Sequence, residues 1–128
     1  MNTVDKKTAF ALKEAGFPQP EPAFGQVWYH TNEVPVVVVG VSYQGAFIFT
    51  AYYSKWKTQE LVLSREALAE MAFAPNAADV LAEMPDGSKI EKLEGGIYSA
   101  LSYIGDVYAF SFERKCVHEA MAARYLDM

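Results

Sequence analysis

"VPVVVVGVSYQGAFIFTAYY", residues 34–53, is twenty residues long and holds no charged side chain. Its length would suit a transmembrane helix, since about 20 apolar residues cross a bilayer. Its residues are mostly β-branched or aromatic, however, and such residues favour strands. Near its middle Gly45 can take the positive φ that a tight turn requires. We therefore predict a soluble β-hairpin with strands at 35–43 and 46–53.

The expected register of this hairpin follows from a two-residue turn at 44–45. With that turn, Gly40 would face Phe49, an arrangement in which an aromatic ring covers a bare glycine in the neighbouring strand. A longer loop would shift the register. Because both faces of the hairpin are apolar, we expect it to lie inside a sheet and not at its edge.

Capping signals and periodicity predict the other elements. A helix over 77–84 should begin at Asn76, with Asp79 in the capping-box position. Alternation over 97–113 predicts a second hairpin with one buried face and a turn at 105–106. The other expected elements are a helix at 4–15, a strand at 25–31, a short strand at 60–64, a helix at 65–72 and a closing helix at 115–126 that packs on the sheet.

A proline-rich segment, "FPQPEPAFG", follows the first helix at 17–25. Its three prolines could form an extended ligand for a groove-binding domain. We favour a stiff connector held in place by Phe17 and Phe24.

The order of these elements predicts an α+β fold. We expect a single domain over 1–128, with a mostly antiparallel sheet built from the two hairpins and flanking strands. N-terminal, middle and C-terminal helices would pack on it. A chain of 128 residues has the size of one ordinary domain.

Composition narrows the classes of function. The formal net charge of -5 argues against broad, charge-driven binding to nucleic acid or anionic membrane. The single cysteine, Cys116, excludes a disulfide framework within one chain, and the N-terminal residues show no signal peptide. We expect a cytoplasmic protein that does not bind membranes.

Residues able to carry catalysis are few, and no phosphate-binding loop or dinucleotide fingerprint occurs. The two histidines, His30 and His118, lack the spacing of a metal site. His30 with Glu33 could act as a general base and its orienting acid. Cys116 could be activated near a helix start, but we favour a small buried residue beside Ala120. The sequence favours a non-catalytic protein, with no metal or cofactor.

The most suggestive surface segment is "YYSKWK", residues 52–57, in which aromatic and basic side chains alternate. Such side chains can stack on bases or anchor a protein partner. We assign Tyr53, Lys55, Trp56 and Lys57 to a binding surface and expect Trp56 to be exposed. The alternative is that the tyrosines complete the core and the lysines are merely solvated.

Three segments carry a family likeness: "LKEAGFPQP" at 12–20, "FAPNAADVLAEMP" at 73–85 and "EAMAARYL" at 119–126. Together they resemble uncharacterised small proteins encoded by phages and prophage regions. Asn76 stands where those proteins more usually have a capping Thr, a change that preserves the cap. The resemblance implies a mobile-element origin and no catalytic or binding residue.

The leading hypothesis is therefore a phage-like accessory protein that acts by binding another macromolecule or by self-association. We expect a homodimer, because the helices do not suffice to cover all of the apolar hairpin surface. The alternative is a small-ligand or nucleotide-binding protein that sequesters its ligand in a pocket between helices and sheet. An enzyme would need His30 and a carboxylate to converge in such a pocket.

Overall fold

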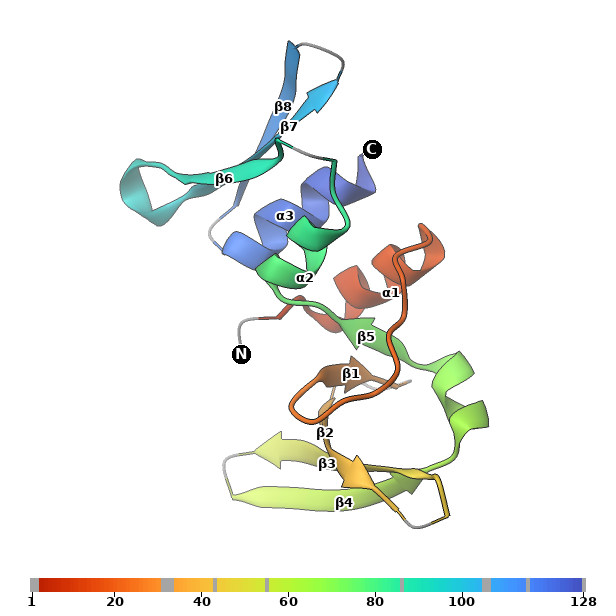
Figure 1. Cartoon of the computed structure of the whole chain (residues 1–128). Coiled ribbons are helices and arrows are strands. Elements are labelled where there is room, and N and C mark those ends of the chain that lie inside the picture. The colour runs from red at the N-terminus through yellow and green to blue at the C-terminus, as the bar shows by residue number, and fades with distance from the viewer. Residues whose placement is uncertain are drawn as a thin grey trace. The chain divides into compact units, whose positions relative to one another are not determined.

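The computed structural model describes residues 3–30, 34–42, 44–54, 56–85, 87–104, 107–114 and 116–127 (Figure 1). The fold is α+β, with antiparallel sheets and helices in the N-terminal, middle and C-terminal parts, as predicted. The chain divides into two compact units, Asp5–Ala74 and Met1–Val4 with Pro75–Met128. In the part of the chain that is described, no helix is both long and apolar enough to cross a membrane.

The unit formed by residues 5–74 is built on a five-stranded antiparallel sheet with the order β4-β3-β2-β1-β5. Its helices are α1 and the 3-10 helix η1. In chain order the elements are α1 (Lys6–Glu14), β1 (Val27–Tyr29), β2 (Pro35–Val41), β3 (Phe47–Ser54), β4 (Lys57–Leu63), η1 (Arg65–Glu70) and β5 (Ala72–Ala74).

The predicted hairpin at 34–53 is confirmed as β2 and β3, and both strands lie inside the sheet. Its predicted register is wrong, because Gly40 faces Ile48 and not Phe49. The shift has two causes. The loop spans 42–46, closed by a 2.7 Å hydrogen bond from the Ser42 amide to the Ala46 carbonyl, and the register slips once more between Val38 and Gly40.

A serine side chain explains why this loop is longer than two residues. The Ser42 hydroxyl accepts hydrogen bonds from the Gln44 amide, at 3.3 Å, and from the Ala46 amide, at 3.2 Å. Gly45 has φ +80°, so it takes the left-handed conformation that the prediction required. The loop therefore includes residues that the prediction assigned to the ends of the two strands.

The two faces of the sheet differ in burial. One face forms the core, where Trp28 is opposite both Val36 and Phe73 and its ring centroid lies 5.6 Å from that of Phe73. The other face, which carries Tyr52 and Val62, is partly open: these side chains are 45% and 60% exposed. The buried core side chains of β2 and β3 are Val36, Val38, Phe47, Phe49 and Ala51.

The helix predicted at 65–72 is wrong in part. Residues 65–70 form the 3-10 helix η1, and Ala72–Ala74 form the fully buried strand β5, paired with β1. The short apolar run around Phe73 suits a helix or a buried strand equally, and periodicity cannot separate the two. Pairing with β1 decides in favour of the strand.

The connector at 17–25 is held differently from the prediction. Phe17 is buried as expected, whereas Phe24 is 82% exposed and holds nothing in place. The side chain of Gln19 takes that role: its Oε1 accepts a 2.9 Å hydrogen bond from the Phe73 amide and its Nε2 donates to the Phe17 carbonyl at 3.1 Å. An amide side chain thus joins the connector to β5.

The second unit contains a three-stranded antiparallel sheet, with the order β6-β7-β8, and two α-helices. The predicted second hairpin is confirmed as β7 and β8, but the prediction of one sheet shared by both hairpins is wrong, because β7 pairs with β6 and not with a strand of the first hairpin. Its turn at 105–106 and the side chains of 101–113 lie outside the described residues. The elements are α2 (Ala77–Ala82), β6 (Lys89–Lys92), the 3-10 helix η2 (Glu94–Gly96), β7 (Tyr98–Ile104), β8 (Val107–Arg114) and α3 (Val117–Leu126).

Capping and packing in this unit follow the sequence closely. The capping box is confirmed: the Asn76 side chain accepts from the Asp79 amide at 2.8 Å, and the Asp79 carboxylate accepts from the Asn76 amide at 3.0 Å. The closing helix α3 packs on β7 and β8, as predicted, and also on α2. It also buries Arg124, whose guanidinium lies 3.7 Å from the Asp127 carboxylate.

Candidate functional site

The predicted binding residues gather where β3 turns into β4. Trp56 is 87% exposed, as expected, and Tyr53 and Lys57 are exposed beside it. Lys55 lies outside the described residues. We call Tyr53, Trp56 and Lys57 the hairpin-tip cluster. No finding tests whether it binds a partner, so its assignment as a binding surface stays a prediction.

Tyr53 connects the members of this cluster to the strands. Its hydroxyl donates a 3.1 Å hydrogen bond to Gln59 Oε1, and Lys57 Nζ lies 5.4 Å from its ring centroid. A cation over an aromatic face is attracted by the ring quadrupole. Tyr53 is 43% exposed, so it does not serve as a full core residue. The tip presents one large indole beside a tyrosine and a cation.

The strand that leads away from this tip, β4, lies at the edge of its sheet. It pairs with β3, and none of the strands that the structure describes pairs with its outer side. An unpaired edge presents a row of backbone donors and acceptors that another strand can use. Both the tip and the edge are therefore surfaces suited to a macromolecular partner.

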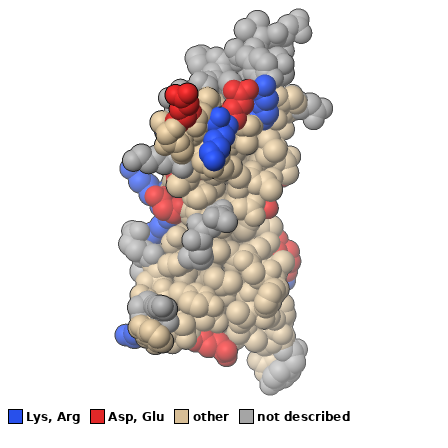
Figure 2. Space-filling model, turned by 90° about the vertical axis from the view of Figure 1, so that its left-hand side faces the viewer, with Lys and Arg blue, Asp and Glu red and all other residues tan. Residues whose placement is uncertain are grey.

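The distribution of charged side chains on this face does not favour nucleic acid as that partner. Acidic and basic side chains adjoin each other near the top of Figure 2, and much of the rest of this face is uncharged. Lys89 and Glu91 on β6 are one ion pair of opposite charges, with charged atoms 3.0 Å apart. Among the residues described on this face there is no broad field of positive charge, which phosphate binding would use.

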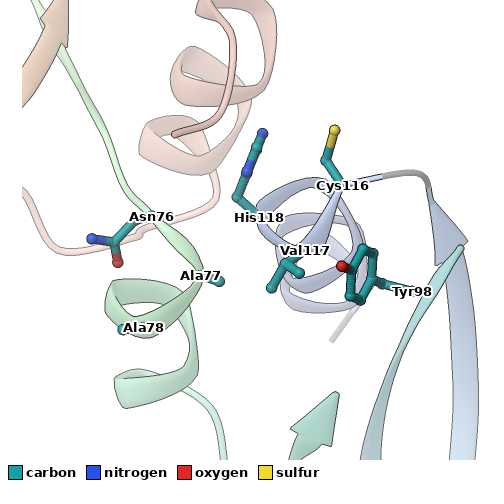
Figure 3. Close-up of a pocket in the computed structure, with 7 residues that line it drawn as sticks. All are labelled: Asn76, Ala77, Ala78, Tyr98, Cys116, Val117 and His118. Carbon is teal, nitrogen blue, oxygen red and sulfur yellow. The ribbon is translucent and has the colours of Figure 1, made fainter. Parts of the chain in front are cut away.

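A second candidate lies within the unit formed by residues 1–4 and 75–128. It is an open pocket of about 520 Å³, a volume within the range of small-molecule sites. Figure 3 shows Asn76, at the start of α2, across from the first turn of α3, with the Tyr98 ring contributed by β7. Its lining residues are Asn76, Ala77, Ala78, Tyr98, Cys116, Val117 and His118.

Cys116 is exposed, so the prediction of a buried cysteine beside Ala120 is wrong. The reason is the start of α3: the helix begins at Val117, which leaves Cys116 as the extended N-cap residue outside the buried stripe. In Figure 3 the side chains of Cys116 and His118 project to the same side of this helix end. No pattern in the sequence predicts that these two residues share a pocket with Tyr98.

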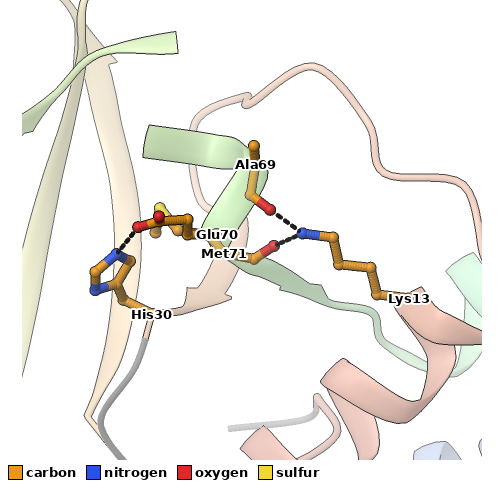
Figure 4. Close-up of polar contacts among 5 residues, drawn as sticks. All are labelled: Lys13, His30, Ala69, Glu70 and Met71. Carbon is orange, nitrogen blue, oxygen red and sulfur yellow. Dashed lines mark hydrogen bonds and ion pairs between the residues drawn. The ribbon is translucent and has the colours of Figure 1, made fainter. Parts of the chain in front are cut away.

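His30, the other candidate for chemistry, takes part in a polar contact near the end of η1 (Figure 4). His30 Nε2 lies 3.9 Å from Glu70 Oε2, and both side chains are substantially exposed. Glu33, the predicted partner, lies outside the described residues. His30 also lines a cavity of only about 70 Å³ with mostly apolar walls, which is far below the size of ordinary ligand sites.

Lys13 provides the other contact in Figure 4. From α1 its ammonium donates to the carbonyl oxygens of Ala69 and Met71, both at 2.6 Å. Ala69 lies in the last turn of η1 and Met71 directly follows the helix, where carbonyls have no intrahelical partners. The Lys13 contacts are therefore best explained as structural contacts that hold the end of η1 to α1.

The same helix is fixed at its start by an ion pair. Both terminal nitrogens of Arg65 donate to the Glu21 carboxylate, at 2.8 and 2.6 Å, and this pairing lowers the pKa of Glu21. The Arg65 guanidinium also lies 5.3 Å from the Phe47 ring centroid. Within the described part of the chain, no three His, Cys, Asp or Glu side chains are placed to hold a metal ion.

Comparisons with protein-family models, with curated proteins and with solved structures give no significant match for this chain.

Proposed function

We propose that this chain is a small cytoplasmic interaction protein that binds a macromolecular partner through its hairpin-tip cluster. The observation that carries this proposal is the 87% exposure of Trp56. The cytoplasmic location is supported by the single cysteine, and a phage or prophage accessory role by the resemblance of the three segments. No group with a catalytic role is part of the proposal.

Exposed tryptophan supports a binding surface for a physical reason. A large aromatic side chain gains stability when it is buried, and in most folded chains it is at least partly covered. Tryptophan and tyrosine are enriched among the residues that dominate binding energies, because they bury a large area with few rotatable bonds. Tyr53 and Lys57 beside Trp56 add a hydroxyl and a cation. These polar groups can orient a bound partner through hydrogen bonds and charge.

The test compares two exposed aromatic side chains in the same unit. Trp56→Ala removes the indole at the tip, and Phe24→Ala removes a ring of similar exposure in the connector, 82% against 87%. Each variant and the wild-type chain are used to capture partners from an extract of the organism that encodes it. We expect both variants to melt near the wild-type temperature and only Trp56→Ala to lose a specific partner.

The opposite results are equally informative. If Trp56→Ala lowers stability by about 3–5 kcal/mol, the indole is a core residue, and the binding surface is rejected. Partners captured equally by all three chains would also reject it.

The pocket in Figure 3 supports a second candidate function, the binding of a small ligand such as a nucleotide. It lies between two helices and a strand, and Asn76, Tyr98 and His118 offer hydrogen-bonding groups around an otherwise apolar lining. Few polar groups on an apolar lining are typical of small-molecule sites.

Cys116 supplies a direct readout for this second candidate, since it is the one cysteine of the chain and lines the pocket. Adenosine and guanosine phosphates are added, and the rate of alkylation of the thiol by iodoacetamide is measured. A bound nucleotide should slow alkylation, and Ala78→Trp, which fills the pocket, should abolish that protection. Alkylation at an unchanged rate with every nucleotide would reject nucleotide binding.

A further inference from the structure

The small cavity that His30 lines lies beside the hairpin-tip cluster, because Tyr53 belongs to both. Its volume is about 70 Å³. The most buried of its wall residues are Val36, Ala51 and Met71, at 4%, 1% and 0% exposed, whereas Tyr53 is 43% exposed. The cavity therefore reaches from the core face of the five-stranded sheet to the surface that carries the cluster. We call it the Tyr53 cavity.

We propose that the Tyr53 cavity receives one branched aliphatic side chain of a protein partner, such as that of valine or leucine, while Trp56 packs on the partner beside it. This inference rests on the proposed function, since it names the chemical class of the partner that the hairpin-tip cluster binds. In protein interfaces the anchoring side chains of one partner fill well-packed pockets on the other.

The size and the walls of the cavity define its occupant. Apart from His30 and Tyr53, the described residues that line it are aliphatic or methionine. Ordered water is a poor occupant of such a space, because a buried water needs about two to four polar partners. A volume of about 70 Å³ has room for a few methyl-sized groups but not for a nucleic-acid base. A short branched aliphatic side chain fits both conditions.

An empty cavity at this place is unfavourable, because protein interiors are close-packed and their larger voids are few. An inserted side chain would give the walls the dispersion contacts that they lack. The rim is already in position for it: the Tyr53 hydroxyl donates to Gln59, and Lys57 lies over the Tyr53 ring. A wall that is ordered in advance lowers the entropic cost of binding.

Charge beside the cavity favours a polypeptide over a nucleic acid. Lys57 Nζ lies 5.4 Å from the Tyr53 ring centroid, and Glu70 lies 3.9 Å from His30, so one cation and one carboxylate stand beside the two polar wall residues. A polyanion would be attracted by the first and repelled by the second, whereas a polypeptide can offer a group of each sign. None of the described residues that line the cavity is a lysine or an arginine, which phosphate binding would use.

The experiment uses N-acetyl-leucine methylamide, an uncharged mimic of a leucine residue, as the probe. The full-length chain is isotope-labelled at its methionine methyl groups, and the nuclear magnetic resonance signal of Met71, in the cavity wall, is followed as the probe is added. The glycine analogue, which lacks the side chain, is the matched control. We expect the leucine probe to shift the Met71 signal and to bind at least about tenfold more tightly than the glycine analogue, because one methylene in a fitting apolar pocket already contributes roughly tenfold or more.

Two substitutions on β3 separate the cavity from the rest of the sheet. Ala51→Val adds two methyl groups at the cavity wall, and Thr50→Val changes the neighbouring residue, which points to the opposite face of the same strand. We expect Ala51→Val to abolish leucine binding without lowering the melting temperature, and Thr50→Val to leave leucine binding unchanged. If Ala51→Val does not fold, Leu61→Phe fills the cavity from the half-buried side chain on β4 and should likewise abolish leucine binding.

Other results overturn the proposal. A Met71 signal that responds equally to the leucine and glycine probes shows that the cavity takes no side chain, and so does leucine binding that survives a folded cavity-filling variant. An oligothymidylate that quenches the fluorescence of the wild-type chain but not of Trp56→Ala, when the leucine probe does not bind, makes nucleic acid the partner. Trp56 is not among the described residues that line the cavity, so Trp56→Ala should still bind leucine. Loss of a captured partner by Trp56→Ala tests the proposed function, and leucine binding tests this inference, so the two can fail separately.

Discussion

Lys13 shows at the scale of one residue how a charged side chain can complete a short helix. Its ammonium is the donor for two carbonyl oxygens at the end of η1, each at 2.6 Å. A 3-10 helix of this length satisfies few of its own terminal carbonyls. The contact therefore fixes η1 to α1 within the same unit.

Replacing Lys13 with methionine should lower the free energy of unfolding by about 2 kcal/mol, because hydrogen bonds from charged donors contribute about 1.5–3 kcal/mol each and water replaces part of the loss. Lys7→Met, at an exposed position of the same helix, is the control and should be near neutral. Urea unfolding curves measure both variants. If the Lys13→Met and Lys7→Met variants were equally stable, the Lys13 contacts with η1 would contribute nothing to the free energy of unfolding.

Glu21 makes the stability of the fold depend on pH. Its pairing with Arg65 lowers the pKa of the carboxyl below its ordinary value of 4.5, so the folded state holds the proton less tightly than the unfolded state. The stabilisation is fully present above pH 4.5 and is lost as the pH falls through the lowered pKa. Because the pair is exposed, salt should weaken it.

Glu21→Gln should therefore lower the melting temperature at pH 7, and the difference from wild type should shrink as the pH falls below 4.5. Glu14→Gln, at the exposed end of α1, is the control. Melting curves from pH 7 to 3 at low and high salt provide the data. A difference that grows on acidification would contradict the assigned sign.

Single residues were predictable from the sequence when local chemistry decided their place. Trp56 was expected to be exposed because β3 had already supplied its core residues, and it is. Cys116 was misplaced because its burial depends on whether α3 begins one residue earlier or later, and helix ends are the least certain feature of a pattern. The pocket shared by Cys116, His118 and Tyr98 depends on tertiary packing, which no local pattern contains.

At the scale of elements, the start of α2 is the clearest case of a sequence signal that forms as expected. Asn76 and Asp79 exchange side-chain-to-backbone hydrogen bonds in a complete capping box. Such a cap satisfies amides that the helix cannot pair itself.

Asn76→Ala should cost about 1 kcal/mol of stability, the usual loss for an N-cap side chain. Asn76→Thr should retain most of that stability, since a threonine hydroxyl can accept the same bond from the Asp79 amide. Thermal melts of the two variants, made in parallel, measure the difference. Equal losses would mean that the side-chain cap is not what stabilises the start of α2.

The first hairpin shows which features of a strand pair the side-chain alternation predicts and which it does not. Its composition predicted two strands inside a sheet, and β2 and β3 occupy that place. The register failed because the Ser42 hydroxyl stabilises a longer loop and because the pairing slips near Val39. Side-chain alternation defines which residues share a face, but the number of loop residues depends on hydrogen bonds that the alternation does not encode.

For the whole molecule, the sequence predicts one domain over 1–128, whereas the chain contacts cluster into two compact units. A unit of about 60 residues buries a smaller share of its unfolded surface than a larger domain does, and it is marginal by itself. The chain also begins in one unit and returns to it: the Val4 amide donates to the Pro75 carbonyl at 3.1 Å. We therefore expect the units to unfold together.

Both tryptophans, Trp28 and Trp56, lie in the unit 5–74, so fluorescence reports on that unit, while far-UV circular dichroism reports on both. A single domain predicts that the two signals change at the same urea concentration. Two separated transitions would show that the units fold independently.

The central claim, that the β3–β4 hairpin is the interaction surface, is tested most directly by the accessibility of Trp56. Acrylamide quenching of tryptophan fluorescence is measured on dilute protein and under conditions in which a complex forms, with Trp56→Phe used to subtract the signal of the buried Trp28. The account predicts an indole that is readily quenched in the dilute protein and shielded in the complex. A Trp56 that stays equally quenchable while the complex forms would contradict it.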